Sequence, residues 1–141
     1  RWQHGMTIAA LCLADSTQIA WAEWYRHPAE IELPPLAGLP RELWRFEIDL
    51  PRVADLLAPG ALESLGLPAP VPDRRQWRSH QPAGEALYAA DLPALIAPSA
   101  ARPSGAVLCM FRPRRELPGV RPAGQPDVVS EPPPPPRGMR T

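Results

Sequence analysis

The sequence predicts a small domain of the α+β class, in which helices are combined with mostly antiparallel strands. Three observations lead to this prediction. An apolar, β-branched stretch over residues 7–13 is followed directly by a helical pattern. Residues 43–50 alternate between apolar and polar side chains, which is typical of a half-buried strand in an antiparallel sheet. Two short apolar segments, residues 95–97 and 106–111, are expected to be the closing strands.

Length and composition limit the classes of protein that the chain can represent. Its 141 residues allow one domain with a moderate core. The 15 basic residues, all arginine, are balanced by 15 acidic ones, which argues against direct nucleic-acid binding through a broad basic surface. The longest apolar run, residues 8–14, is too short to span a bilayer. Cys12 and Cys109 lie in apolar runs and are expected to be core thiols in a reducing compartment.

A helix is expected after the first strand, and it carries an acidic residue on its apolar side. Asp15 or Ser16 can cap its first turn, and Pro28 is expected to end it. Ile19 and Glu23 share one face at i, i+4 spacing. Glu23 is therefore either a solvated residue at the edge of the stripe or a functional carboxylate. The aromatic residues that flank it are expected to pack in the core, with a docking or self-association patch as the alternative: Trp21, Trp24 and Tyr25.

The rest of the chain is expected to alternate loops with short helical segments. The folded domain is expected to cover residues 1–111, and the proline-rich residues 112–141 are expected to form a disordered tail. Between the strands, the expected segments are a surface connection at 28–42, helical turns at 53–57 and 61–65, a loop at 68–78 and a helix at 82–90.

Three polar residues stand in or beside stretches that otherwise read as apolar: Arg1, Glu23 and Ser99. Burying an arginine, a carboxylate and a hydroxyl is unfavourable unless they pair with one another or with a ligand. If the three converge in space, they form a site that binds anions and stabilises positive charge. The three histidines are scattered without metal-ligand spacing, so no metal site is expected.

In order along the chain, the segments resemble the RES-domain family. RWQHG at residues 1–5 and AWAEWYRH at 20–27 resemble the start of its catalytic core. WRFEIDLPRVADLLAPGALESLGLP at 44–68 resembles its middle strand and the helical turns after it. EALYAADLPALIAPSAARPSGAVLCMF at 85–111 resembles its closing helix, serine loop and last strand. The family's name-giving arginine, glutamate and serine correspond to Arg1, Glu23 and Ser99.

The resemblance implies a fold, an activity and partners. The fold is that of ADP-ribosyltransferases, a small α+β domain with a bent, split sheet that is rich in antiparallel strands. Characterised RES proteins are cytoplasmic bacterial toxins of toxin–antitoxin pairs. They degrade NAD, their substrate, by cleaving the nicotinamide–ribose bond, with phosphate or water as acceptor. The partner is usually an Xre-like antitoxin, with which the toxin can assemble into an oligomer.

The resemblance implies chemical roles for three residues, and Arg102 in the serine loop is a further candidate that is otherwise simply solvated. Glu23 stabilises the positive charge that develops on ribose, or orients the acceptor. Arg1 binds the pyrophosphate through bidentate hydrogen bonds from its guanidinium. Ser99 holds the ribose or the nicotinamide amide, and Arg102 adds a second contact to the anion.

The resemblance also leaves two alternative functions open. One is mono-ADP-ribosylation of a macromolecule, which shares the cleavage step and changes the acceptor. The other is a catalytically degenerate domain that only binds its antitoxin. The family usually has a tyrosine in the strand before the glutamate helix, and the matching position here is Cys12. The domain is further expected to lack the family's first segment, which carries another arginine of the site.

Overall fold

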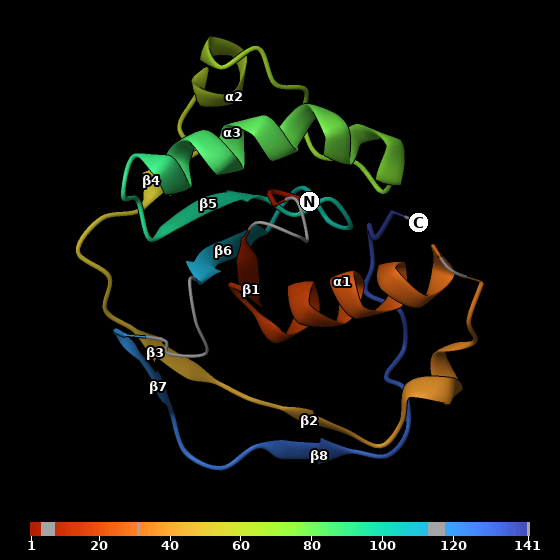
Figure 1. Ribbon diagram of the computed structural model, residues 1–141. Coiled ribbons are helices and arrows are strands. Elements are labelled where there is room, and N and C mark those ends of the chain that lie inside the picture. Colours follow the sequence, from red (N-terminus) through yellow and green to blue (C-terminus); the bar gives the residue numbers. More distant parts are fainter. Residues whose placement is uncertain (4–7, 31, 113–117, 141) are drawn as a thin grey trace.

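A four-stranded sheet forms the centre of the computed structural model, which describes residues 1–3, 8–30, 32–112 and 118–140 (Figure 1). The strand order is β1-β6-β5-β4. Their bounds are Ala9–Ala14 for β1, Ala106–Arg112 for β6, Ala94–Pro98 for β5 and Ala54–Asp55 for β4. All neighbours are antiparallel except the short β4, which runs parallel to β5. The strands expected around residues 7–13, 95–97 and 106–111 are confirmed in their described residues.

Helices cover both faces of this sheet. Helix α1 (Thr17–Ala29) packs beside β1, and α3 (Trp77–Ala89) packs on β5, with the short α2 (Ala61–Ser64) next to α3 (Figure 1). The core lies under α3 and consists of the buried residues Trp2, Ile8, Leu56, Leu95, Ala97, Cys109 and Phe111. Removing these apolar side chains from water provides the main driving force for docking the helices on the sheet.

A second strand layer is built from two short antiparallel ladders. β2 (Arg41–Leu43) pairs with β8 (Asp127–Val129), and β3 (Phe46–Ile48) pairs with β7 (Val120–Pro122). The sequence predicted one strand over residues 43–50, and this is wrong. The structure instead has two strands, and their partner segment turns between β7 and β8, where Gly124 has a positive φ of 86° and Pro126 precedes β8. The mixed α+β class and the split, mostly antiparallel sheet are confirmed.

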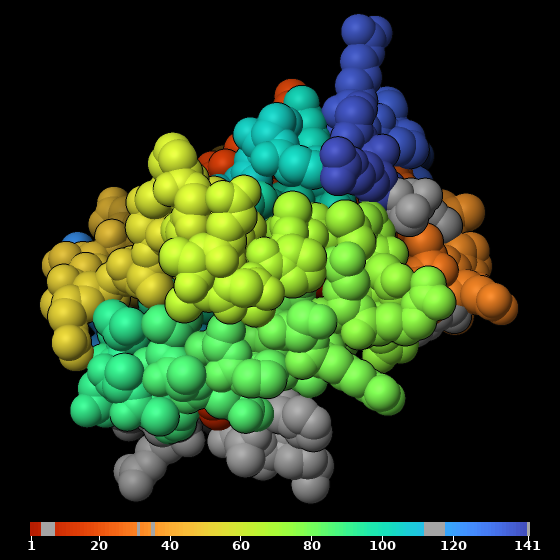
Figure 2. Space-filling view, turned by 90° about the horizontal axis from the view of Figure 1, so that it is seen from above, coloured from red at the N-terminus to blue at the C-terminus, as the bar shows by residue number. Residues whose placement is uncertain are grey.

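The prediction of an unstructured tail does not hold for two segments, because β7 and β8 both lie after residue 111. The final proline-rich segment also contacts the domain. The hydroxyl of Tyr25 donates a hydrogen bond to the carbonyl of Pro133, and the N–H of Arg140 donates one to the carbonyl of Ala101 at 2.6 Å. Figure 2 shows the end of the chain beside the loop that contains Ala101. Composition alone did not reveal these long-range partners.

Two expected helical segments differ from the structure. Residues 53–57 contain β4 instead of a helical turn, because Ala54 and Asp55 pair with β5 and the N–H of Leu56 donates to the carbonyl of Ile96 at 2.8 Å. Helix α3 begins at Trp77, within the expected loop, and keeps Pro82 in its interior. The turn before Pro82 carries the fully buried His80, whose ring nitrogens lie 2.8 Å and 3.0 Å from the carbonyl oxygens of Gln76 and Pro68. Helix α1 likewise continues past Pro28 to Ala29.

Candidate functional site

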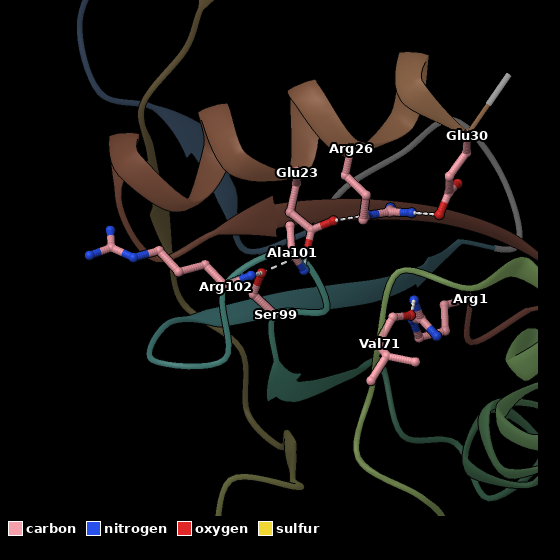
Figure 3. A network of polar contacts seen from close by, with 8 residues as sticks. All are labelled: Arg1, Glu23, Arg26, Glu30, Val71, Ser99, Ala101 and Arg102. Carbon is pink, nitrogen blue, oxygen red and sulfur yellow. Dashed lines mark hydrogen bonds and ion pairs between the residues drawn. The ribbon is translucent and has the colours of Figure 1, made fainter. Parts of the chain in front are cut away.

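The acidic residue of the site is held on α1, at a position that the helix cap and the apolar face determine. The hydroxyl of Ser16 accepts a hydrogen bond from the N–H of Ile19 at 3.3 Å and caps the first turn. Ile19 and Ala22 are buried against the domain. Glu23 is the next residue on this side, so its carboxylate points toward the loop after β5 and not into solvent (Figure 3).

The serine loop, which we define as residues 99–105, meets this carboxylate. The hydroxyl of Ser99 donates to Oε1 of Glu23 at 2.7 Å, and the N–H of Ala101 donates to the same oxygen at 3.3 Å. The Ser99 oxygen in turn accepts from the N–H of Arg102 at 3.0 Å. Gly105 allows the loop to approach α1, because a Cβ there would lie 2.2 Å from Ile19. The glutamate and the serine, two of the three polar residues singled out in the sequence, therefore pair with each other in the structure.

Ser99 holds Glu23 but is itself covered. Its exposed fraction is 0%, and its hydroxyl is occupied by Glu23 and by the N–H of Arg102. The sequence assigned it a contact with ribose or the nicotinamide amide. In the described structure its chemistry is instead to position the carboxylate.

Arg1 is brought to the site by a close backbone contact with α3. Gly84 makes this contact possible, because a Cβ at residue 84 would lie 1.7 Å from the carbonyl oxygen of Trp2. The indole of Trp2 is buried and packs edge-on against the ring of His80. The side-chain amide of Gln81 donates to the carbonyl of Gln3 at 2.9 Å. These contacts fix the backbone that carries the guanidinium.

The guanidinium of Arg1 is only partly satisfied. Nη2 donates to the carbonyl of Val71 at 2.7 Å, whereas Nη1 is buried and has no hydrogen-bond partner among the described residues. Burial, and then the positive charge of Arg26, lower the pKa of Arg1 from its ordinary value. A buried donor without a partner is unfavourable, and an anionic ligand would relieve this.

Arg26 is a site residue that the sequence reasoning missed. Its Nε donates to Oε2 of Glu23 at 2.8 Å, and its Nη1 pairs with Oε1 of Glu30 (Figure 3). The i, i+3 and i, i+4 spacings of these residues on one helix were a signal for such a network. Each oxygen of Glu23 thus has its own partners, and the carboxylate is fixed in orientation.

These contacts decide the charge of Glu23. Burial alone would raise the pKa of this carboxyl. The hydrogen bond from Ser99 and the positive charge and hydrogen bond of Arg26 act in the opposite direction, and they hold the pKa below its ordinary value. Glu23 is therefore a carboxylate at neutral pH, in a site that also contains two guanidinium groups.

Arg1, Glu23 and Arg26 line one cavity of about 300 Å³, between α1 and the edge of the central sheet. A larger cavity of about 580 Å³ is lined by residues of β1, the start of α1 and the second strand layer. The two cavities share four lining residues, Cys12, Leu13, Ala14 and Ala20. Volumes of this size are typical of small-molecule sites. The site can bind an anion at Arg1 and stabilise positive charge at Glu23.

The guanidinium of Arg102 lies apart from this cavity. Its Nη1 donates to the side-chain oxygen of Gln18, and the side chain lines a separate hollow of about 340 Å³ formed with the proline-rich segment. Only its backbone N–H contributes to the site, through Ser99. The Arg102 side chain, which was expected to contact the anion, therefore lies outside the Glu23 cavity, where its hydrogen bond to Gln18 holds it along α1.

Cys12 also differs from expectation. It was predicted to be a core thiol like Cys109, which is buried, but it is exposed and lines both cavities.

Within the described residues, no group of three or more histidine, cysteine or carboxylate side chains is arranged to hold a metal ion. None of the described helices is long and apolar enough to cross a membrane.

Comparisons with known proteins agree with the resemblance. A family model described as the RES domain matches residues 1–128. Among solved structures, the chain is similar to one in the crystal structure of the M. tuberculosis MbcT–MbcA toxin–antitoxin complex, with a TM-score of 0.73 and 23% sequence identity. That match covers 92% of this chain and 70% of the other, and it shows a shared fold. No curated protein matches the chain.

Proposed function

The chain belongs to the RES-domain family, and from this premise we propose that it is the toxin of a bacterial toxin–antitoxin pair that consumes NAD. The proposed reaction breaks the bond between nicotinamide and the adjacent ribose. The substrate is NAD itself, and the reaction takes place in the bacterial cytoplasm, where the NAD pool is available.

The observation that best supports this proposal is an oriented, ionised Glu23 in a cavity that Arg1 also lines, with an Nη1 that has no partner among the residues described. NAD offers matching groups, because its pyrophosphate is an anion and its nicotinamide ribose becomes positively charged as the bond breaks. A guanidinium suits the pyrophosphate, and a carboxylate suits the charged ribose.

The proposed chemistry assigns one task to each group. Nicotinamide leaves with the electron pair of its bond to C1′ of ribose, and Glu23 stabilises the oxocarbenium-like carbon that remains. An acceptor oxygen then forms the new bond to C1′ and gives up its proton. Ser99 and Arg26 keep the carboxylate in place, so that it need not reorganise as charge develops.

The two cavities, which share residues of β1 and α1 in their walls, support a dinucleotide in preference to a smaller ligand. The reacting ribose would lie in the cavity of about 300 Å³ beside Glu23, and the adenosine half would extend into the cavity of about 580 Å³. Trp44 and Phe46 line the larger cavity and supply aromatic surface for a flat base.

We propose water or phosphate as the acceptor, and the two are separated by their products. Purified protein with NAD should yield nicotinamide together with ADP-ribose in phosphate-free buffer. In phosphate buffer, phosphorolysis would give the phosphorylated sugar instead. Labelled ADP-ribose on protein or nucleic acid, with little free product, would identify the alternative of macromolecular ADP-ribosylation.

The proposed partner is an Xre-like antitoxin. A toxin–antitoxin complex as a structural neighbour supports a partner of this kind. If a small helix-turn-helix protein is encoded beside the gene, its co-expression should restore growth and yield a stable complex on size-exclusion chromatography. Separate elution of the two proteins without restored growth would contradict this assignment.

The proposed function is tested by inducing the full protein in bacteria and measuring cellular NAD over time. We expect NAD to fall before growth stops. A Glu23→Ala variant should leave both NAD and growth unchanged, while Ser104→Ala, an exposed serine of the same loop, should behave as the parent. Growth arrest with undiminished NAD, or full toxicity of Glu23→Ala, would contradict the proposal.

A further inference from the structure

Two thiols face each other at the wall of the cavity that holds Glu23. Cys12 on β1 and Cys109 on β6 are directly opposite in the antiparallel register. Their sulfur atoms lie 3.6 Å apart. These are the two cysteines of the chain, so an intramolecular disulfide has one possible pairing.

The backbone geometry at this pair is compatible with a disulfide. Residues directly opposite in an antiparallel ladder have Cα atoms about 4.5–5.5 Å apart. Disulfides usually join Cα atoms about 4.4–6.8 Å apart, with a sulfur–sulfur bond of about 2.0 Å. The sulfur atoms of Cys12 and Cys109 would therefore need to approach by roughly 1.5 Å, a distance that side-chain rotation can supply.

The two thiols differ in accessibility, and this difference determines which of them is oxidised first. Cys12 is exposed and lines both cavities, so a small oxidant in solvent reaches it first. Cys109 has an exposed fraction of 1%, so an oxidant in solvent does not reach it directly. An accessible thiol beside a second, protected thiol is the arrangement of a sensing cysteine with its resolving partner.

The pKa values of the two thiols also indicate that Cys12 is oxidised before Cys109. The hydrogen bond from the Cys109 thiol lowers the pKa of Cys12 to about 7, so a large share of Cys12 is thiolate at neutral pH. The same hydrogen bond, together with burial, raises the pKa of Cys109. Once Cys12 is oxidised and neutral, the thiolate that keeps Cys109 protonated is gone.

We propose that Cys12 and Cys109 form a peroxide-sensitive modification site in the wall of the Glu23 cavity. When Cys12 is oxidised, the two residues form a disulfide bond. The Cys12 thiolate attacks one oxygen of hydrogen peroxide; the O–O bond breaks, the leaving hydroxide takes up a proton as water, and a sulfenic acid forms on Cys12. The Cys109 sulfur then attacks the Cys12 sulfur, and the hydroxyl departs as water with the Cys109 proton. Two thiols and one peroxide thus give one disulfide and two waters.

The test treats the reduced full chain with hydrogen peroxide, alkylates the remaining thiols in denaturant and measures the intact mass. Both thiols should disappear together, the mass should fall by two hydrogen atoms within a single chain, and dithiothreitol should restore both. Before oxidation, alkylation of Cys12 at pH 7 should be about threefold faster than that of cysteine in an unstructured peptide, since a larger thiolate fraction outweighs its weaker nucleophilicity.

Two variants separate the roles of the thiols. Cys109→Ala should leave a sulfenic acid on Cys12 that dimedone captures, with no loss of two hydrogens. Cys12→Ser, at the exposed position, should leave the Cys109 thiol reduced at the same peroxide dose; it keeps the test decisive if removing the buried Cys109 prevents folding.

Three results would overturn the proposal. They are survival of both thiols at a dose that oxidises free cysteine, disulfides only between chains, or a Cys12 sulfinic acid beside an intact Cys109 thiol. None of these measurements depends on NAD turnover, so a failure here is distinct from a failure of the proposed function.

Discussion

The hydroxyl of Ser99 donates to Oε1 of Glu23 at 2.7 Å, although 76 residues separate the two in the chain. The serine lies directly after β5, and the glutamate lies on the helix that follows β1. The central sheet brings the two elements together, because β6 pairs with both β1 and β5. The contact orients a carboxylate toward a cavity, which makes the serine a positioning residue for the proposed chemistry.

Replacing Ser99 with alanine tests this positioning role. The variant removes one donor to Glu23 and leaves Oε1 with the N–H of Ala101. We expect kcat for NAD cleavage to fall on the order of 100-fold through misplacement of the carboxylate, with little change in KM. The acid limb of the pH–rate profile should also move to higher pH, because the hydrogen bond from Ser99 lowers the pKa of Glu23. Ser104→Ala is the matched control, and an equal loss in both variants would contradict the assignment.

Acid should destabilise the protein through Glu23. The pKa of this carboxyl is lower in the folded state than its ordinary value of 4.5, so its ionised form stabilises the fold at neutral pH. That contribution is present above about pH 4.5 and is lost as the pH falls through the folded-state pKa. Urea unfolding of the parent and of Glu23→Gln should differ most at pH 7 and converge at low pH. A difference that grows on acidification would contradict the inferred direction of the shift.

Gly84→Ala should destabilise the protein, although alanine is normally the better helix former. A Cβ at this position would lie 1.7 Å from the carbonyl oxygen of Trp2, so either α3 or the backbone next to Arg1 must move. We expect a loss of more than about 2 kcal/mol in the free energy of unfolding, against the roughly 1 kcal/mol gain that propensity alone would give. The control Ala86→Gly, at an exposed site of the same helix, should cost about 1 kcal/mol. Stabilisation by Gly84→Ala, measured by urea unfolding, would contradict the close contact.

A bound nucleotide should protect Cys12 from alkylation. Cys12 lines both cavities in which the proposed substrate lies, so ADP-ribose, a product of the proposed reaction, should cover its thiol. We expect the alkylation rate at pH 7 to fall at least fivefold at saturating ADP-ribose, with AMP protecting less. An unchanged rate under conditions where calorimetry detects binding would place the nucleotide elsewhere.

The sequence predicted the central elements well where local pattern and burial agree. The apolar runs of β5 and β6 and the capped helix α1 follow from local pattern, and Glu23 and Ser99 were singled out because a buried polar side chain requires a partner. The second strand layer was predicted only in part, because a strand over residues 43–50 and a split sheet were expected but the partner strands β7 and β8 were not. Its partners lie in a proline-rich segment, and composition carries no information on which distant strand such a segment meets.

The wrong or missing predictions for three site residues have a common physical cause. Arg102 was assigned to the cavity by its charge, yet a neighbour on α1, Gln18, holds it outside. Cys12 was assigned to the core by its apolar neighbours, although β1 turns this side chain toward the cavities. Arg26 went unassigned because an arginine near a helix end is usually solvated. In each case the direction of a side chain depends on contacts that become visible only in three dimensions.

The most direct test of the central claim is nicotinamide release by the purified full protein, compared with its Glu23→Gln and Glu30→Gln variants. Glu30 pairs with the same arginine but does not contact Ser99, so its variant controls for loss of the ion pair. The account predicts steady nicotinamide release by the parent, at least a 100-fold loss in Glu23→Gln and a loss of less than about tenfold in Glu30→Gln. Undiminished release by a folded Glu23→Gln variant, or no release by the folded parent, would contradict it.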